Sequence, residues 1–186
     1  MPAQLEEIFP KNNKLDTYFW TPNRIISEAI NWLVTSSNTK ILDIGSGSGK
    51  FCLTGALQSK AHFTGVEKRK NLVKESNDKL NKSSLQNVIF VHSNITAIDF
   101  SKYNAFYFYN PFGEHLNPSS EHLDNNISFS EDKFNIYQDY VINQLNKLKK
   151  GVRLVTYYSP YFSPPASFFI QKISKDGNLV FWTKTK

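Results

Sequence analysis

Short apolar runs alternate along the chain with longer segments in which apolar residues recur at helical spacing. The runs predict buried strands, over Ile41–Ile44, His62–Val66, Val88–His92, Ala105–Tyr109 and Val152–Tyr158. The segments predict helices, one that begins at Thr21-Pro22 and others over Phe51–Ser59, Lys70–Leu80 and Asp132–Lys149. Strands that alternate with helices are typical of an α/β fold with a doubly wound, mostly parallel sheet.

The last part of the chain follows a different pattern. Phe168–Ile173 and Leu179–Thr183 both have strand character, and they flank Asp176-Gly177-Asn178. A short segment with Asp-Gly between two strands is typical of a hairpin turn. The sequence therefore predicts that the parallel sheet is followed by a C-terminal antiparallel hairpin.

Two stretches lack periodicity. Residues 1–20 predict a loosely structured N-terminal arm, and residues 21–186 predict a single domain. Within that domain, residues 113–131 are polar and contain Pro118. A loop of this length is uncommon in a compact domain and is usually either functional or disordered.

Charge keeps one class of partner open. The chain has a formal net charge of +6 and a pI of about 9.3. Such a balance raises the chance of a nucleic-acid partner. Many of the lysines fall in predicted helices, where a run of charge is usually a solvated face. A nucleic acid is thus a possible partner, and the charge alone does not require one.

Other features exclude several functions. The chain has one cysteine, Cys52, so it forms neither an internal disulfide nor a cysteine metal cluster. Its histidines have no metal-ligand spacing, and we expect no metal. The first residues do not resemble a signal peptide, and no apolar run is long enough to span a membrane. We therefore expect a cytoplasmic protein without a membrane partner.

A glycine-rich turn follows the first predicted strand. The strand ends at Ile44, and Gly45, Gly47 and Gly49 follow at alternate positions before the next helix. Glycines permit positive φ and let a ligand approach the backbone. The spacing differs from the dinucleotide and phosphate-loop patterns. Asp43, ahead of the first glycine, would repel a pyrophosphate but suits a ligand that carries an ammonium group.

A second acidic residue closes the next predicted strand. Glu67 lies about 20 residues after Gly47, where an acid accepts hydrogen bonds from ribose hydroxyls in nucleoside-binding sheets. Each signal alone is weak, because a glycine turn is often only a turn and a terminal Glu is often only solvated. On consecutive strands at this distance, the two together predict a nucleoside site.

These two motifs resemble those of the class I S-adenosylmethionine-dependent methyltransferases, whose sheet is Rossmann-like. Asp43–Gly49 looks like the first motif of that family, and Gly65-Val66-Glu67 like the second. The terminal hairpin also fits. The resemblance implies S-adenosyl-L-methionine as cofactor and assigns its binding to Asp43, Gly45, Ser46, Gly47, Gly49, Glu67, Asn94 and Ile95. Asn94 stands where the family usually has an acid and would bind the adenine amino group.

A further motif follows the fourth predicted strand. Asn110-Pro111-Phe112 resembles the Asn-Pro-Pro-Tyr/Phe motif of amino-methylating enzymes, although it has one proline where that motif has two. The resemblance implies catalytic roles: Asn110 would orient the target nitrogen, and the Phe112 ring would pack on it. The alternative is that Asn110-Pro111 only ends a strand as a turn.

The acceptor remains open. Residues 113–131 contain Glu114, Glu121, Asp124 and Glu131 but no Lys or Arg, and aromatic residues follow the fifth strand. Acids and aromatic faces attract a protonated amine. The sequence also resembles, more loosely, small protein-lysine methyltransferases. We therefore expect a methyltransferase for an amine nitrogen, with protein lysine favoured. The alternatives are a nucleic-acid or small-molecule methyltransferase, or a non-catalytic module that binds S-adenosylmethionine.

Overall fold

The computed structural model describes residue 9, residues 21–116 and residues 128–186 of the chain. The predicted arm over residues 1–20, apart from Phe9, lies outside the described residues. So do Pro118, Glu121 and Asp124 of the predicted loop.

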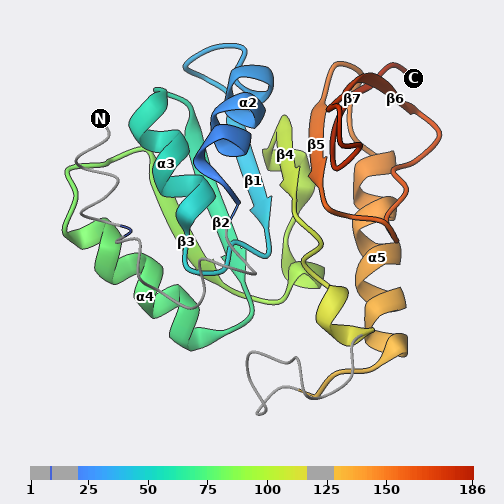
Figure 1. Cartoon of the computed structure of the whole chain (residues 1–186). Helices are drawn as coiled ribbons and strands as arrows, with labels where there is room; N and C mark the ends of the chain where they lie inside the picture. Colours follow the sequence, from blue (N-terminus) through green and yellow to red (C-terminus); the bar gives the residue numbers. More distant parts are fainter. Residues whose placement is uncertain (1–8, 10–20, 117–127) are drawn as a thin grey trace.

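A mixed sheet forms the centre of the described part of the molecule (Figure 1). Its strands are β1 (Lys40–Ile44), β2 (His62–Glu67), β3 (Val88–His92), β4 (Ala105–Phe108), β5 (Arg153–Tyr157), β6 (Phe168–Ile173) and β7 (Leu179–Lys184). Their spatial order is β3-β2-β1-β4-β5-β7-β6. The first five are parallel, whereas β7 is antiparallel to both β5 and β6. The predicted mostly parallel sheet with a C-terminal antiparallel hairpin is confirmed.

Helices cover both faces of this sheet, as a doubly wound fold requires (Figure 1). The helices are α2 (Asn23–Leu33), α3 (Lys50–Gln58), α4 (Lys70–Asn81) and α5 (Glu131–Asn146). Helices α2 and α3 pack on one face, and α5 packs on the other with the short turns η2 (Ile95–Ala97) and η3 (Phe100–Lys102).

The central strands β1 and β4 are buried on both faces because each face has its own core. In β1, Ile41 belongs to the cluster under α2 and α3, while Leu42 belongs to the cluster under α5. In β4, Tyr107 and Phe106 divide in the same way. A strand that is buried on both faces therefore reads as a continuous apolar run.

The start of α2 differs from the prediction. Pro22, not Thr21, occupies the N-cap position, and no side chain caps the helix. The buried Thr21 hydroxyl instead bonds the Tyr107 phenol at 2.8 Å. A buried phenol needs a polar partner, and Thr21 satisfies it at the cost of the cap.

Several element boundaries also differ from the prediction. The last long helix ends at Asn146, before a turn in which Gly151 has φ +92°. Gly113–His115 forms one helical turn, η4, inside the loop that lacks periodicity in the sequence. Ser130 caps α5 by accepting from the Lys133 N–H at 3.3 Å, so that helix begins at Glu131.

Candidate functional site

A cavity of about 750 Å³ opens at the carboxyl ends of β1, β2 and β4. Ligands occupy this side of the sheet in open α/β folds. The structure brings nearly all the predicted site residues to its wall, namely Asp43, Gly45, Ser46, Gly47, Glu67, Asn94, Ile95, Asn110, Pro111 and Phe112. Gly49 does not line the cavity. It is the N-cap of α3 with φ +84°, and because it lacks a Cβ, which would lie 2.5 Å from the Phe90 ring, Phe90 packs against its backbone.

The glycine turn is held by backbone hydrogen bonds. The N–H groups of Gly45 and Ser46 donate to the Val66 carbonyl at 2.9 and 3.0 Å. Gly45 has φ +77°, and a Cβ there would lie 2.5 Å from the Pro111 Cβ. Gly47 has φ +53°, but a Cβ there would meet no atom within 4 Å. Gly45 therefore packs against the Asn110-Pro111-Phe112 segment, whereas Gly47 leaves room for a ligand.

Glu67 is fixed at the cavity wall by two backbone donors. Its Oε2 accepts from the Gly47 N–H at 3.1 Å, and its Oε1 accepts from the Arg69 N–H at 2.9 Å. The residue is 6% exposed. A carboxylate has about four acceptor positions, so two remain for hydroxyl donors. This geometry fits a ribose, whose two hydroxyls donate side by side.

Asp43 supplies a buried carboxyl on the same wall. It is 3% exposed, and the Cys52 thiol donates to its Oδ2 at 3.4 Å. Burial raises the pKa of Asp43 to about 7; the Cys52 hydrogen bond opposes this, and the Glu67 charge adds to it. A cation in the cavity would favour the ionised form. The position fits the ammonium group of a methionine moiety.

Asn110 stands at the end of β4 in an uncommon conformation, with φ +37°. Its N–H donates to the Ser159 Oγ at 3.0 Å, and its carbonyl accepts from the Gly113 N–H at 3.2 Å. The side-chain amide lies against Gly113, where a Cβ would be 2.4 Å from the Asn110 Nδ2. The two hydrogen bonds of the backbone, to Ser159 and from Gly113, fix the backbone of Asn110 at the cavity.

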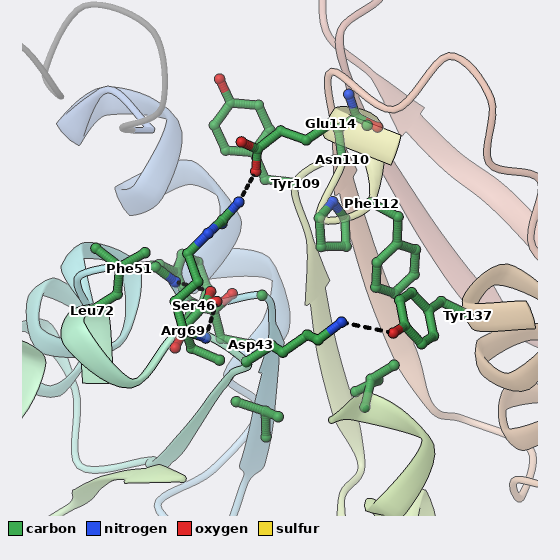
Figure 2. Close-up of a pocket in the computed structure, with 18 of the residues that line it drawn as sticks. Asp43, Ser46, Phe51, Arg69, Leu72, Tyr109, Asn110, Phe112, Glu114 and Tyr137 are labelled. Carbon is green, nitrogen blue, oxygen red and sulfur yellow. Dashed lines mark hydrogen bonds and ion pairs between the residues drawn. The ribbon is translucent and has the colours of Figure 1, made fainter. Parts of the chain in front are cut away.

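A tyrosine that sequence reasoning missed enters the cavity from α5 (Figure 2). Tyr137 Oη accepts from Lys68 Nζ at 3.0 Å and from Asn94 Nδ2 at 3.1 Å. Burial raises the pKa of Tyr137, but the hydrogen bonds from Lys68 and Asn94 outweigh it, so the pKa falls below its usual value. Because Tyr137 lies on the buried stripe of its helix, its spacing is that of a core residue.

An ion pair spans the cavity between Arg69, after β2, and Glu114, on η4 (Figure 2). The two side chains are 12% and 14% exposed. The sequence predicts an acidic mouth, but in the described part Glu114 is neutralised by Arg69, and Lys68 lines the same cavity. Nothing in the sequence signals this pair, whose members lie on separate elements.

Two kinds of feature are absent from the described part of the chain. Within residues 21–116 and 128–186, no group of His, Cys, Asp or Glu side chains has the arrangement needed to hold a metal ion. None of the helices there has the length and apolar character needed to cross a bilayer.

A family of known proteins matches most of the chain. Residues 35–159 fit the family described as "Methyltransferase domain". The chain belongs to this family. The match includes the glycine turn, Glu67 and Asn110, and it confirms the predicted class of methyltransferase and its cofactor, S-adenosylmethionine.

Curated relatives match a part of this methyltransferase domain. The 23S rRNA (uracil(1939)-C(5))-methyltransferase RlmD of Shewanella sediminis is 36% identical over 78 residues, which is 42% of this chain and 17% of the relative. The protein of the same name from Vibrio parahaemolyticus is 29% identical over 87 residues, 47% of this chain and 20% of the relative. The chain thus matches about a fifth of these relatives or less.

Solved structures share the fold over nearly the whole chain. An RNA methyltransferase from Salinibacter ruber, in complex with S-adenosyl-L-homocysteine, has a TM-score of 0.66 and 16% identity, covering 90% of this chain and 94% of that one. A putative methyltransferase, yhhF from Escherichia coli, has a TM-score of 0.63 and 17% identity, covering 89% and 88%. At these identities the likeness confirms the Rossmann-like fold class.

Proposed function

We propose that this chain transfers a methyl group from S-adenosylmethionine to an amine nitrogen of an RNA base. The observation that carries the proposal is that Asn110-Pro111-Phe112 lines the same cavity as the glycine turn and Glu67, whose geometry fits a nucleoside. Pro111 packs against Gly45 of the glycine turn. The segment that would place the acceptor is therefore in direct contact with the turn that would bind the cofactor.

The residues of the cavity fit the cofactor. Glu67 would hold the ribose hydroxyls with its free acceptor positions, and Asp43 would face the ammonium group. The open side of Gly47 gives the backbone room to approach. When bound, the cofactor supplies an electrophilic methyl group on a sulfonium. The remaining chemistry, which is the placement of the acceptor, falls to the protein.

Asn110 would place the acceptor. An amide oxygen that accepts a hydrogen bond from the acceptor N–H directs the nitrogen lone pair toward the methyl group. Orientation of this kind is effective only when the orienting group is itself fixed. The bonds of Asn110 to Ser159 and Gly113 fix its backbone.

Nitrogen is favoured over carbon as the acceptor atom, although the relatives' names specify C5 of uracil. Methylation of a pyrimidine at C5 needs a nucleophile that first adds to the ring, which is the usual task of a thiolate. The chain has one cysteine, Cys52, and it is fully buried. Burial and the nearby Asp43 raise the pKa of its thiol well above the usual range. No thiolate of this chain therefore faces the cavity.

RNA is favoured over protein lysine, the acceptor that sequence analysis prefers. Glu114, one of the acids behind the lysine prediction, is paired with Arg69, and Lys68 lines the same cavity, so Glu114 offers a protonated lysine little attraction. The curated relatives are named as rRNA methyltransferases, and the Salinibacter protein is titled an RNA methyltransferase. The net charge of +6 suits a phosphate backbone.

A labelled-methyl assay tests this function. The protein and methyl-tritiated S-adenosylmethionine are incubated together in three separate reactions. One contains deproteinised bacterial ribosomal RNA, one contains RNA-free protein, and one contains small metabolites. We expect label in the RNA, and nuclease digestion should yield a nucleoside methylated on nitrogen. Label confined to protein or metabolites would overturn the RNA assignment. A 5-methyluridine product would overturn the choice of nitrogen.

A further inference from the structure

Two residues other than glycine have positive φ in the described chain, and both border the cavity. Asn110, with φ +37°, follows β4, and Tyr158, with φ +47°, follows the neighbouring strand β5. Asn adopts this region with some ease, but a bulky side chain rarely does. A strained residue of this kind persists where its surroundings hold it, often at ligand clamps.

The surroundings of Tyr158 hold it in two ways. Its N–H donates to the Asn178 carbonyl, in the turn between β6 and β7, at 2.9 Å. The next residue, Ser159, donates to the Tyr157 carbonyl at 2.8 Å and accepts from the Asn110 N–H at 3.0 Å. One hydroxyl therefore joins the strained end of β4 to the strained end of β5.

The same strand ends present a group of tyrosines. The Tyr109 and Tyr157 rings lie 4.9 Å apart, and the Tyr157 and Tyr158 rings lie 5.6 Å apart at a steep angle. Tyr157 is buried, whereas Tyr158 is 53% exposed, and both Tyr109 and Tyr158 line the cavity. Tyr158 therefore has open ring surface at the cavity and a rigid support behind it.

Phe112 has no comparable surface. It is 8% exposed, and its ring packs against Phe108 at 5.7 Å and Tyr137 at 5.4 Å. In Figure 2 the Phe112 ring points toward Tyr137, whereas the Tyr109 ring points away from Tyr137. Phe112 is thus packed into the wall of the cavity. Another ring would have to stack on the acceptor.

We infer that Tyr158, with Tyr109 beside it, is the platform on which the acceptor base stacks while Asn110 orients its amine nitrogen. The inference rests on the proposed function. It gives the strain at Tyr158 a role: the conformation keeps a large aromatic ring at the edge of the cavity that Asn110 also lines. Bases that enter an active site are commonly held between aromatic faces, and such stacking is tolerant of sequence.

Three variants of Tyr158 separate stacking from structure. Tyr158→Phe keeps the ring and should retain the KM for RNA. Tyr158→Ala removes the ring. Tyr158→Asn also removes the ring, but Asn tolerates positive φ, so this variant should keep or raise the melting temperature. Phe169→Ala is the matched control, since Phe169 is 44% exposed on β6 and does not line the cavity.

The readouts are the KM for deproteinised ribosomal RNA, the affinity for S-adenosylhomocysteine, and the melting temperature. We expect Tyr158→Ala and Tyr158→Asn to raise the KM by about tenfold or more. Affinity for S-adenosylhomocysteine should stay within about twofold, and Phe169→Ala should match the wild type. A loss of melting temperature in Tyr158→Asn with an unchanged KM would overturn the inference and leave the proposed function standing. Failure of the wild type to methylate RNA would overturn both.

Discussion

At the scale of single residues, the cavity depends on groups that serve the fold and the ligand at once. Glu67 ties the glycine turn to β2 and keeps acceptor positions open. Asp43 is buried next to Cys52, and Asn110 is held in a strained conformation. Substitutions must therefore be paired with variants that separate stability from binding.

Glu67→Ala should weaken binding of S-adenosylhomocysteine by about 1–3 kcal/mol, the scale for hydrogen bonds to a charged group and for a donor left unsatisfied. Glu67→Gln, which keeps one acceptor oxygen, should lose less. Titration calorimetry of both variants provides the measurement. An unchanged dissociation constant in Glu67→Ala would remove Glu67 from the cofactor site.

If Asn110 orients the acceptor, as proposed, Asn110→Ala should abolish methyl transfer and leave affinity for S-adenosylhomocysteine nearly intact. Misplacement of an acceptor alone can cost about 100-fold in rate. Alanine at φ +37° is strained, so Asn110→Gly is the matched variant: it accepts this φ and should also be inactive. Full turnover in a folded Asn110→Gly protein would show that the segment is only a turn.

The raised pKa of Asp43, about 7, gives the unliganded protein a pH dependence. Between pH 4 and 7 the folded state retains a proton that the unfolded state has lost, so the contribution of Asp43 to stability decreases as pH rises through this window. Asp43→Asn removes this contribution. Its melting temperature should therefore decrease less than that of the wild type from pH 4 to pH 7. Parallel curves for the two proteins in thermal scans would contradict the assignment.

At the scale of elements, the sequence predicts what is local. The strands, the glycine turn and the hairpin each depend on neighbouring residues, and the structure contains all of them. Contacts between elements that lie far apart in the sequence leave no such local pattern. Arg69, at the start of α4, meets Glu114 on η4, and Tyr137 reaches Lys68 from α5. Thr21 leaves its expected cap position because Tyr107, far along the chain, needs a partner.

The contact between β1 and β4 makes a further prediction at this scale. Gly45→Ala places a methyl group 2.5 Å from the Pro111 Cβ, while Gly47→Ala meets nothing within 4 Å, and both have positive φ. Overpacking costs about 1–3 kcal/mol, so Gly45→Ala should lower the free energy of unfolding by roughly that much more than Gly47→Ala. Urea denaturation of the two variants measures the difference. Equal losses would mean that Pro111 moves aside freely.

At the scale of the whole molecule, charge and fold act separately. The net charge of +6 belongs to the entire chain, whereas the cavity places Asp43, Glu67 and Glu114 beside Lys50, Lys68 and Arg69. Composition therefore does not predict the charge of the cavity, and the lysine prediction rests on the acidic residues of the loop.

The concentration of salt should affect binding of RNA and binding of S-adenosylhomocysteine differently. Binding of RNA by a basic protein releases counterions and weakens as salt rises. The KM for ribosomal RNA should therefore rise between 50 and 200 mM NaCl, while the affinity for S-adenosylhomocysteine, for which the proposed site is a cavity and not an open surface, should change little. A KM that does not respond to salt would argue against a phosphate-bearing acceptor.

The insertion of β7 between β5 and β6 has a consequence for the order of folding. β6 contacts the rest of the sheet only through β7, so it has no ladder partner until Leu179–Lys184 has left the ribosome. The β6–β7 turn closes a short loop, and local pairs form before distant ones. The hairpin is therefore expected to assemble first and then to dock on β5 as a unit. Since Asn178 of this hairpin holds Tyr158, this edge of the cavity reaches its final form only after the hairpin has docked on β5.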